Sequence, residues 1–215
     1  MRPTLGTVKY HHDMPAPSRA AAVSALPRPH RDRLLEGMAR AVAAQGYADT
    51  TIADIVREAA VSRRTFYEHF ATKADCLVAL YDAASRQALQ VLRDGLDPRQ
   101  SWDAQLEAAM AAYVRCLGQS PVLLRTLFID ILALGPAGLA ARRRVSLEIA
   151  AFIQQVAERP TSGHPAPFTP ALALAVVGAV HELVLEAVES GRTGPLDAVV
   201  APACALVRAV ARRSA

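Results

Sequence analysis

The chain has 215 residues, of which 52% are hydrophobic and 20% charged, and its formal net charge is +4 at pH 7. This length allows one large domain or two small ones, with ample material for a core. The three cysteines, Cys76, Cys116 and Cys204, stand apart from one another, so neither a disulfide framework nor a zinc site is expected, and a reducing cytosol fits.

The first 28 residues are rich in proline and lack any sustained periodicity, which predicts a disordered arm. Residues 1–33 contain six arginines and lysines against two aspartates, a surplus of four, so the remainder of the chain is neutral overall. The arm is either an inert tail or an electrostatic aid to DNA binding. Its pair His11-His12 could bind a metal only adventitiously.

Three helices are expected to follow. The first runs from about His30 to Gln45 and is ended by Gly46, with its apolar face formed by Leu34, Leu35, Met38, Ala41 and Val42. The next two lie near residues 51–59 and 62–70 and are separated by a tight break. Thr51 (or Thr50) and Ser62 supply the hydroxyls that cap their N-termini.

In the second of this pair, Phe66 and Phe70 are four residues apart and share the buried face, which leaves the arginines, the threonine and the tyrosine on other faces. Two short helices joined by a turn, the second basic at its beginning, are the plan of a helix-turn-helix.

The run V-S-R-R-T-F-Y-E-H-F-A-T-K (61–73) resembles the signature of TetR-family transcriptional regulators. The preceding pattern R-x-x-L-L-E-x-M-A-R and G-Y-A-D-T-T-I-A-D-I is similar to that family's first helix and loop, so the resemblance covers roughly residues 30–80. One departure is visible. Ala60 stands where the family usually has glycine, so the turn is expected to be built slightly differently.

The resemblance implies DNA contacts. Arg63, Arg64 and Thr65 are expected to meet base edges in the major groove, since arginine can address guanine O6 and N7 together. Thr51, Tyr67, His69 and Lys73 are expected to bind phosphates and so to set the register of the protein on DNA, as the matching family positions do. The full expected set is Thr51, Ser62, Arg63, Arg64, Thr65, Tyr67, His69 and Lys73.

Helical patterns continue to the end of the chain without a strand signal. The expected segments are Thr72 to about Arg93, Trp102–Gly118, Pro121–Leu134, Gly135-Pro136 to about Glu158, Thr169–Ser190 and Leu196–Arg213, with a loop over Pro160–Pro170. The fold is therefore expected to be all-α: an arm (1–28), a three-helix DNA-binding domain (29–72) and a six-helix ligand-binding and dimerisation domain (73–215). TetR-like proteins share that architecture.

A small-molecule pocket is expected among the helices from about Trp102 to Glu158, because small residues beside bulky apolar ones can leave a cavity. The candidate lining is Trp102, Met110, Tyr113, Leu117, Arg125, Phe128 and Phe152, with Tyr113 and Arg125 orienting a polar end of the ligand. A fully packed core is the alternative, and the same residues would also make it.

The last two helices carry more apolar surface than one domain needs, which predicts an isologous dimer through a four-helix interface. The candidate interface is Val176, Val180, Leu183, Val184, Val199, Ala203, Leu206, Val207 and Val210. Packing of both helices within their own domain is the alternative. His181, Glu182 and Glu186 interrupt the most apolar stretch, so it is expected to be a buried helix and not a membrane span.

Signs of an enzyme are missing from the sequence. His181-Glu182 resembles the start of HExxH, but Leu185 occupies the position of the second ligand. The run Arg142–Arg144 is expected to be a solvated helix surface, or else a second contact to DNA or to an anionic ligand.

The leading hypothesis is a cytoplasmic bacterial regulator, a repressor by the family's default, that binds a palindromic operator as a homodimer and responds to a small, largely apolar effector, without a cofactor. A helical ligand carrier with no DNA role is the alternative, and an enzyme on a helical scaffold is a distant third.

Overall fold

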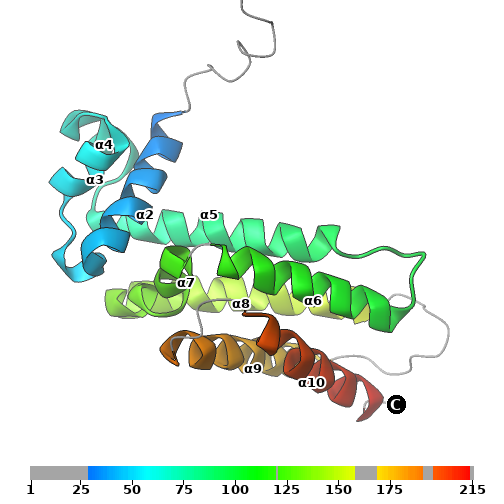
Figure 1. Ribbon diagram of the computed structural model, residues 1–215. Coiled ribbons are helices and arrows are strands. Elements are labelled where there is room, and N and C mark those ends of the chain that lie inside the picture. The colour runs from blue at the N-terminus through cyan, green and yellow to red at the C-terminus, as the bar shows by residue number, and fades with distance from the viewer. Residues whose placement is uncertain (1–28, 120, 158–168, 191–195, 214–215) are drawn as a thin grey trace, which may run out of the picture.

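The computed structural model describes residues 29–119, 121–157, 169–190 and 196–213. In these residues the chain forms nine α-helices and two 3-10 helices, with no strand (Figure 1). The predicted all-α class is thus confirmed, with three helices followed by six. The predicted arm over residues 1–28 lies outside the described residues, as does the predicted loop up to residue 168.

The first three helices are α2 (His30–Asp49), α3 (Ile52–Ala59) and α4 (Arg63–His69). Helix α2 is interrupted at Gly46, where φ is 78°, so its regular part ends where the sequence predicts. Thr51 caps α3 in a reciprocal pair with Asp54, and the Ser62 hydroxyl caps α4 by accepting from the Thr65 N–H at 3.0 Å. Such caps satisfy the N–H groups that a helix leaves unpaired at its beginning.

The turn between α3 and α4 is closed from α2. Ala60 adopts the left-handed conformation, with φ 50° and ψ 49°, which costs alanine more than it costs glycine. The guanidinium of Arg33 donates to the carbonyl oxygens of Ala59, at 3.1 Å, and of Ala60. The guanidinium of Arg40 donates to the carboxylate and to the backbone carbonyl oxygen of Glu58. Two cations from α2 therefore lie at the C-terminus of α3, where the helix dipole favours positive charge.

Helix α5 (Lys73–Asp94) belongs to two hydrophobic cores. Thr72 and Asp75 form its capping box. Its first turns contribute Cys76, Leu77 and Leu80 to the core of the first three helices, and its later turns contribute Tyr81, Ala88 and Leu89 to the second core. One continuous helix is therefore packed into both cores and connects the two halves of the protein.

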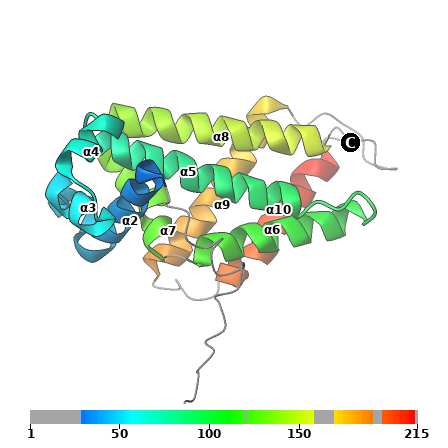
Figure 2. The ribbon, with the colours of Figure 1, turned by 90° about the horizontal axis from the view of Figure 1, so that it is seen from above.

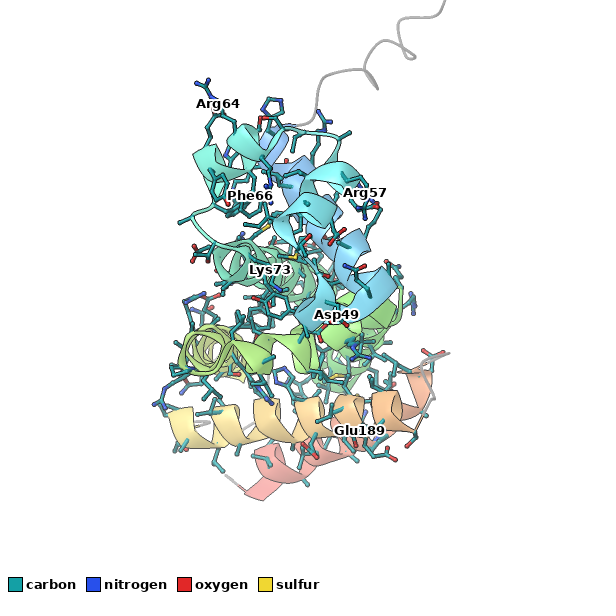
Figure 3. The ribbon with its side chains drawn as sticks, turned by 90° about the vertical axis from the view of Figure 1, so that its left-hand side faces the viewer. Asp49, Arg57, Arg64, Phe66, Lys73 and Glu189 are labelled. Carbon is teal, nitrogen blue, oxygen red and sulfur yellow. The ribbon has the colours of Figure 1, made fainter. Side chains whose placement is uncertain are left out.

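The second core is built by the remaining helices: α6 (Trp102–Gly118), α7 (Pro121–Phe128), η1 (Asp130–Leu134), α8 (Pro136–Ala157), α9 (Pro170–Glu189), η2 (Leu196–Val199) and α10 (Val200–Arg213). Two segments predicted as single helices are thus each divided into a 3-10 and an α-helical part. Seen from above, α5 lies between α6 and α8, and α9 crosses beneath them (Figure 2). Helices α9 and α10 lie at the end of the molecule opposite α3 and α4 (Figure 3).

By length and apolarity, α9 could cross a membrane. In the structure, however, one of its faces packs into the second core through Ala173, Val176, Val177, Val180, His181, Val184 and Ala187. Its other face is exposed. The helix is therefore a core helix with one uncovered side.

Candidate nucleic-acid interface and ligand cavity

Helix α4 presents a basic outer surface. Phe66 and Phe70 are buried beneath it, while Arg63, Arg64, Tyr67 and His69 are exposed. The Arg64 side chain is 90% exposed and projects away from the protein (Figure 3). Its Nε lies 3.1 Å from Glu68 Oε1, but an exposed pair one helical turn apart contributes little free energy. Arg64 can therefore exchange this partner for an acceptor outside the protein.

Three expected DNA contacts also hold the local structure together. The hydroxyls of Ser62 and Thr65 lie 2.9 Å apart, and the Thr51 hydroxyl donates to Asp54 Oδ2 at 2.6 Å. Hydrogen bonds from Thr51 and then Arg57 lower the pKa of Asp54 from its ordinary value, so the cap is ionised at neutral pH. Replacing these hydroxyls would therefore disturb the helix beginnings together with any DNA contact.

Lys73 is engaged inside the protein. Its Nζ donates to the carbonyl oxygens of Thr50 at 2.7 Å, Tyr47 at 2.9 Å and Ala48 at 3.4 Å, and it lies 4.2 Å from the centre of the Tyr47 ring. An ammonium group has three N–H donors, and all three are directed at this loop. The side chain thus ties the end of α2 to the beginning of α5, which the sequence did not predict.

A cavity of about 390 Å³ lies within the second core. Of the residues that the sequence suggested for a pocket, Trp102, Met110, Tyr113 and Phe152 line it. The rest of the lining comes from α6, from α8, α9 and α10, and from the end of α5 with the loop that follows it: Leu92, Leu96, Pro98, Gln105, Leu106, Ala109, Ile149, Ile153, Val156, Val176, Val177, Val180, His181 and Val207. The volume and the mostly apolar lining with few polar groups are those of a small-molecule site.

Three candidate pocket residues lie elsewhere. Leu117 and Phe128 line a separate recess of about 20 Å³. The Arg125 side chain is 63% exposed and its Nε lies 3.6 Å from Asp130 Oδ1, so it does not face the cavity. His181 and Gln105, which the sequence did not suggest as ligand contacts, supply polar groups instead.

Most of the expected dimer residues are also placed differently. Val176, Val180 and Val207 line the cavity, and Val184, Val199 and Ala203 are buried in the second core, so these six cannot meet a partner. Leu183, Leu206 and Val210 are half-buried. The exposed faces are formed instead by Ala171, Leu174, Ala175 and Gly178 on α9 and by Ala201, Pro202, Ala205 and Ala209 on α10.

His181 should make stability depend on pH. Burial and then the charge of Arg142 lower its pKa from 6.5 to about 4. The folded state holds this histidine neutral, whereas the unfolded chain takes up a proton below about pH 6.5. The contribution of His181 to the free energy of unfolding is therefore largest above that pH and is lost as the pH falls toward 4. Between pH 7 and pH 5 the free energy of unfolding should decrease by about 2 kcal/mol.

Urea unfolding of the wild type and of His181→Gln at both pH values measures this change. The variant should show a smaller loss than the wild type by about that amount. Equal losses in the two proteins would assign the acid sensitivity to other groups.

Residues 34–80 match the model of a family described as bacterial regulatory proteins, tetR family. The chain is 33% identical to the HTH-type transcriptional regulator TcmR of Streptomyces glaucescens over 83 residues, which cover 37% of each protein. It is 29% identical to the uncharacterized HTH-type transcriptional regulator YxbF of Bacillus subtilis over 79 residues, or 37% of this chain and 21% of that one. The matches thus span well under half of the curated relatives.

Solved structures are similar over far more of the chain. A TetR-family regulator from Syntrophomonas wolfei superposes with a TM-score of 0.69 at 14% identity, covering 85% of this chain and 94% of that one. FadR of Bacillus subtilis, solved in complex with stearoyl-CoA, gives 0.67 at 14% identity, with 84% and 97% covered. At such identities the likeness concerns the fold.

Proposed function

The chain belongs to the tetR family of bacterial regulatory proteins, and from that premise we propose that it is a cytoplasmic transcriptional repressor. In this proposal it binds a palindromic operator as a homodimer and is released by a small, largely apolar effector. Residues 29–72 form the DNA-binding unit, and residues 73–215 bind the effector and the second protomer. The observation that carries the proposal is the exposed, basic face of α4 over a buried aromatic pair.

The beginning of α4 suits the major groove, which is about 12 Å wide and admits one α-helix. Arg63 and Arg64 follow directly after the Ser62 cap and point outward, so their guanidinium groups can reach base edges. Thr51, Tyr67 and His69 flank them and would contact phosphates, which fix the register but carry no sequence information.

Arg64→Ala should weaken operator binding by about 1–3 kcal/mol and relax the preference at particular base pairs. The physical reason is the loss of a bidentate contact to a base edge, with only an exposed pair to Glu68 lost inside the protein. Sequences selected from a random DNA pool supply the operator, and fluorescence anisotropy then measures affinity for selected and random DNA.

The matched control is Arg99→Ala, which removes an equally exposed arginine in the loop after α5. This control should change neither affinity nor preference. If Arg64→Ala weakens selected and random DNA equally, Arg64 contacts only the backbone. If the wild type retains no DNA at moderate salt, the alternative of a helical ligand carrier is favoured, since the cavity alone would serve it.

A second protomer is the partner that suits the exposed faces of α9 and α10. These faces contain several small residues, which allow helices to approach closely: Ala171, Ala175, Gly178, Ala201, Ala205 and Ala209. Gly178 lies in the interior of α9, where glycine costs about 1 kcal/mol relative to alanine, yet a Cβ there would meet nothing within 4 Å. Nothing in the described protomer requires this glycine, whereas a closely packed helix from a second copy would.

The cavity supports the effector role. It is lined by residues of α6, α8, α9, α10 and the end of α5, and α5 also packs into the core of the DNA-binding unit. An effector that prefers one position of α5 shifts operator affinity by its differential affinity for the two states. FadR of Bacillus subtilis, which shares the fold, was solved in complex with stearoyl-CoA, a molecule with a long apolar chain.

A further inference from the structure

Polar groups meet at one end of the cavity. Tyr113 from α6, His181 from α9 and Ile149 from α8 form a wall shared by the cavity and the small recess behind it. The far side of the recess is lined by Tyr81 and Ser85 of α5 and by Arg142 of α8. The rest of the cavity lining is apolar except for Gln105, which lies three residues after Trp102 on α6. The cavity is therefore mostly apolar, and its wall toward the recess is where two polar side chains, Tyr113 and His181, lie together.

Three of these polar side chains have no hydrogen-bond partner in the described part of the chain. They are the Tyr113 hydroxyl, the His181 imidazole and the Arg142 guanidinium. His181 is only 8% exposed, and its ring packs edge-on against Phe128 with the centroids 5.2 Å apart. Buried polar groups in proteins are almost always hydrogen-bonded. The buried Tyr113 hydroxyl and His181 imidazole, together with the half-buried Arg142, can therefore bind a polar group from outside the chain.

The charge at the polar end is positive and uncompensated. No aspartate or glutamate lines the cavity or the recess. Arg144 pairs with Asp82 at 2.6 Å, whereas Arg142, two residues earlier, has no carboxylate partner among the described residues. Arg142 lines the recess, and its charge adds to the lowering of the pKa of His181 that burial causes, while it opposes the rise that burial causes in the pKa of Tyr81.

All three unpartnered groups can donate hydrogen bonds, and the recess of about 20 Å³ holds one group of the size of water. One carboxylate oxygen has that size, and its charge suits arginine. An amine would be repelled by Arg142, and an alcohol would leave the cation without a counter-charge.

We infer that the effector is an amphipathic carboxylate, with its apolar part in the cavity and its carboxylate between Tyr113, His181 and Arg142. This inference rests on the proposed effector role of the cavity. It also assigns a task to Arg142 that differs from those of Arg143, which is exposed, and Arg144, which is paired.

The protein carries its own reporter, because Trp102 is its single tryptophan and lines the cavity. Titrations of the full chain with hexanoate, octanoate, decanoate and dodecanoate should change Trp102 fluorescence. Each added methylene pair should tighten binding by about an order of magnitude until the cavity is filled. Decanoate should bind about tenfold to a hundredfold more tightly than decanol, and decylamine most weakly.

Arg142→Gln should remove the preference for decanoate over decanol, while the matched control Arg143→Gln should retain it. Tyr113→Phe, which keeps the shape of the ring, should reduce the same preference without changing decanol binding. Thermal melting by circular dichroism verifies that each variant is folded. If Arg142→Gln is unfolded at the temperature of the titration, the inference is tested by the preference that Tyr113→Phe shows for decanoate over decanol.

Equal binding of decanoate and decanol to the wild type would overturn the carboxylate inference but leave the effector cavity standing. An unchanged preference in both Arg142→Gln and Tyr113→Phe would do the same. If no acid, alcohol or amine in the series alters Trp102 fluorescence, the cavity is not an amphiphile site and the proposed effector role fails with it.

Discussion

Phe66→Ala should destabilise the DNA-binding unit by about 3–5 kcal/mol and abolish operator binding, although Phe66 touches no DNA. Its side chain is fully buried in the core that α2, α3, α4 and the beginning of α5 form, with the ring centroids of Phe70 and Tyr67 5.8 Å and 5.6 Å from its own. Alanine would leave a cavity in a small core, and domains of this size are stabilised by only about 5–15 kcal/mol.

Two probes separate the halves of the protein. Circular dichroism follows all helices, whereas Trp102 fluorescence follows the second core only. In urea, Phe66→Ala should lose part of its helix signal well before the fluorescence changes. Its matched control is Tyr67→Phe, which removes only a hydroxyl from an exposed ring and should change stability by no more than about 0.5 kcal/mol. A Phe66→Ala protein with wild-type stability would show that the aromatic pair does not hold α4.

Features of the first half follow from local chemistry, which is why the sequence predicts them. The hydroxyls of Thr51, Ser62 and Thr72 cap the three helices at the expected positions, because capping needs only a side-chain oxygen and the next three residues. At Ala60 the sequence predicts a turn built slightly differently, whereas in the structure Ala60 itself adopts the left-handed conformation that glycine favours. The sequence does not predict the role of Lys73 in tying α2 to α5, because its hydrogen-bond partners lie 23–26 residues away along the chain.

The second half shows where periodicity stops being informative. Helix α9 is apolar on nearly every face, so the pattern could not separate the side that packs inward from the side left uncovered. Most of the valines chosen for an interface fill the core, as do Ala173, Ala187 and Ala203, whereas Ala171, Ala175 and Gly178 are exposed. Similarly, only the packing of α6, α8 and α9 brings Tyr113, Arg142 and His181 together, because they are far apart in the sequence.

Gly178→Leu should dissociate the proposed dimer. In a lone protomer the substitution is harmless or favourable, because a Cβ at this position meets nothing and leucine is a better helix former than glycine. In a two-fold interface the added side chain enters twice, once from each copy. At about 1–3 kcal/mol of overpacking per copy, dimerisation should weaken by at least about thirtyfold.

Loss of the dimer should also cost operator affinity, since a palindrome is then bound one half-site at a time. Sedimentation over a range of concentrations measures the first effect and anisotropy with the selected operator the second. Ala43→Leu is the matched control: it adds the same bulk to an exposed position on α2, away from α9 and α10, and should leave the sedimentation unchanged. A wild type that sediments as a monomer at micromolar concentration contradicts the dimer itself. A Gly178→Leu protein that stays dimeric, with a raised melting temperature, moves the interface off this face of α9.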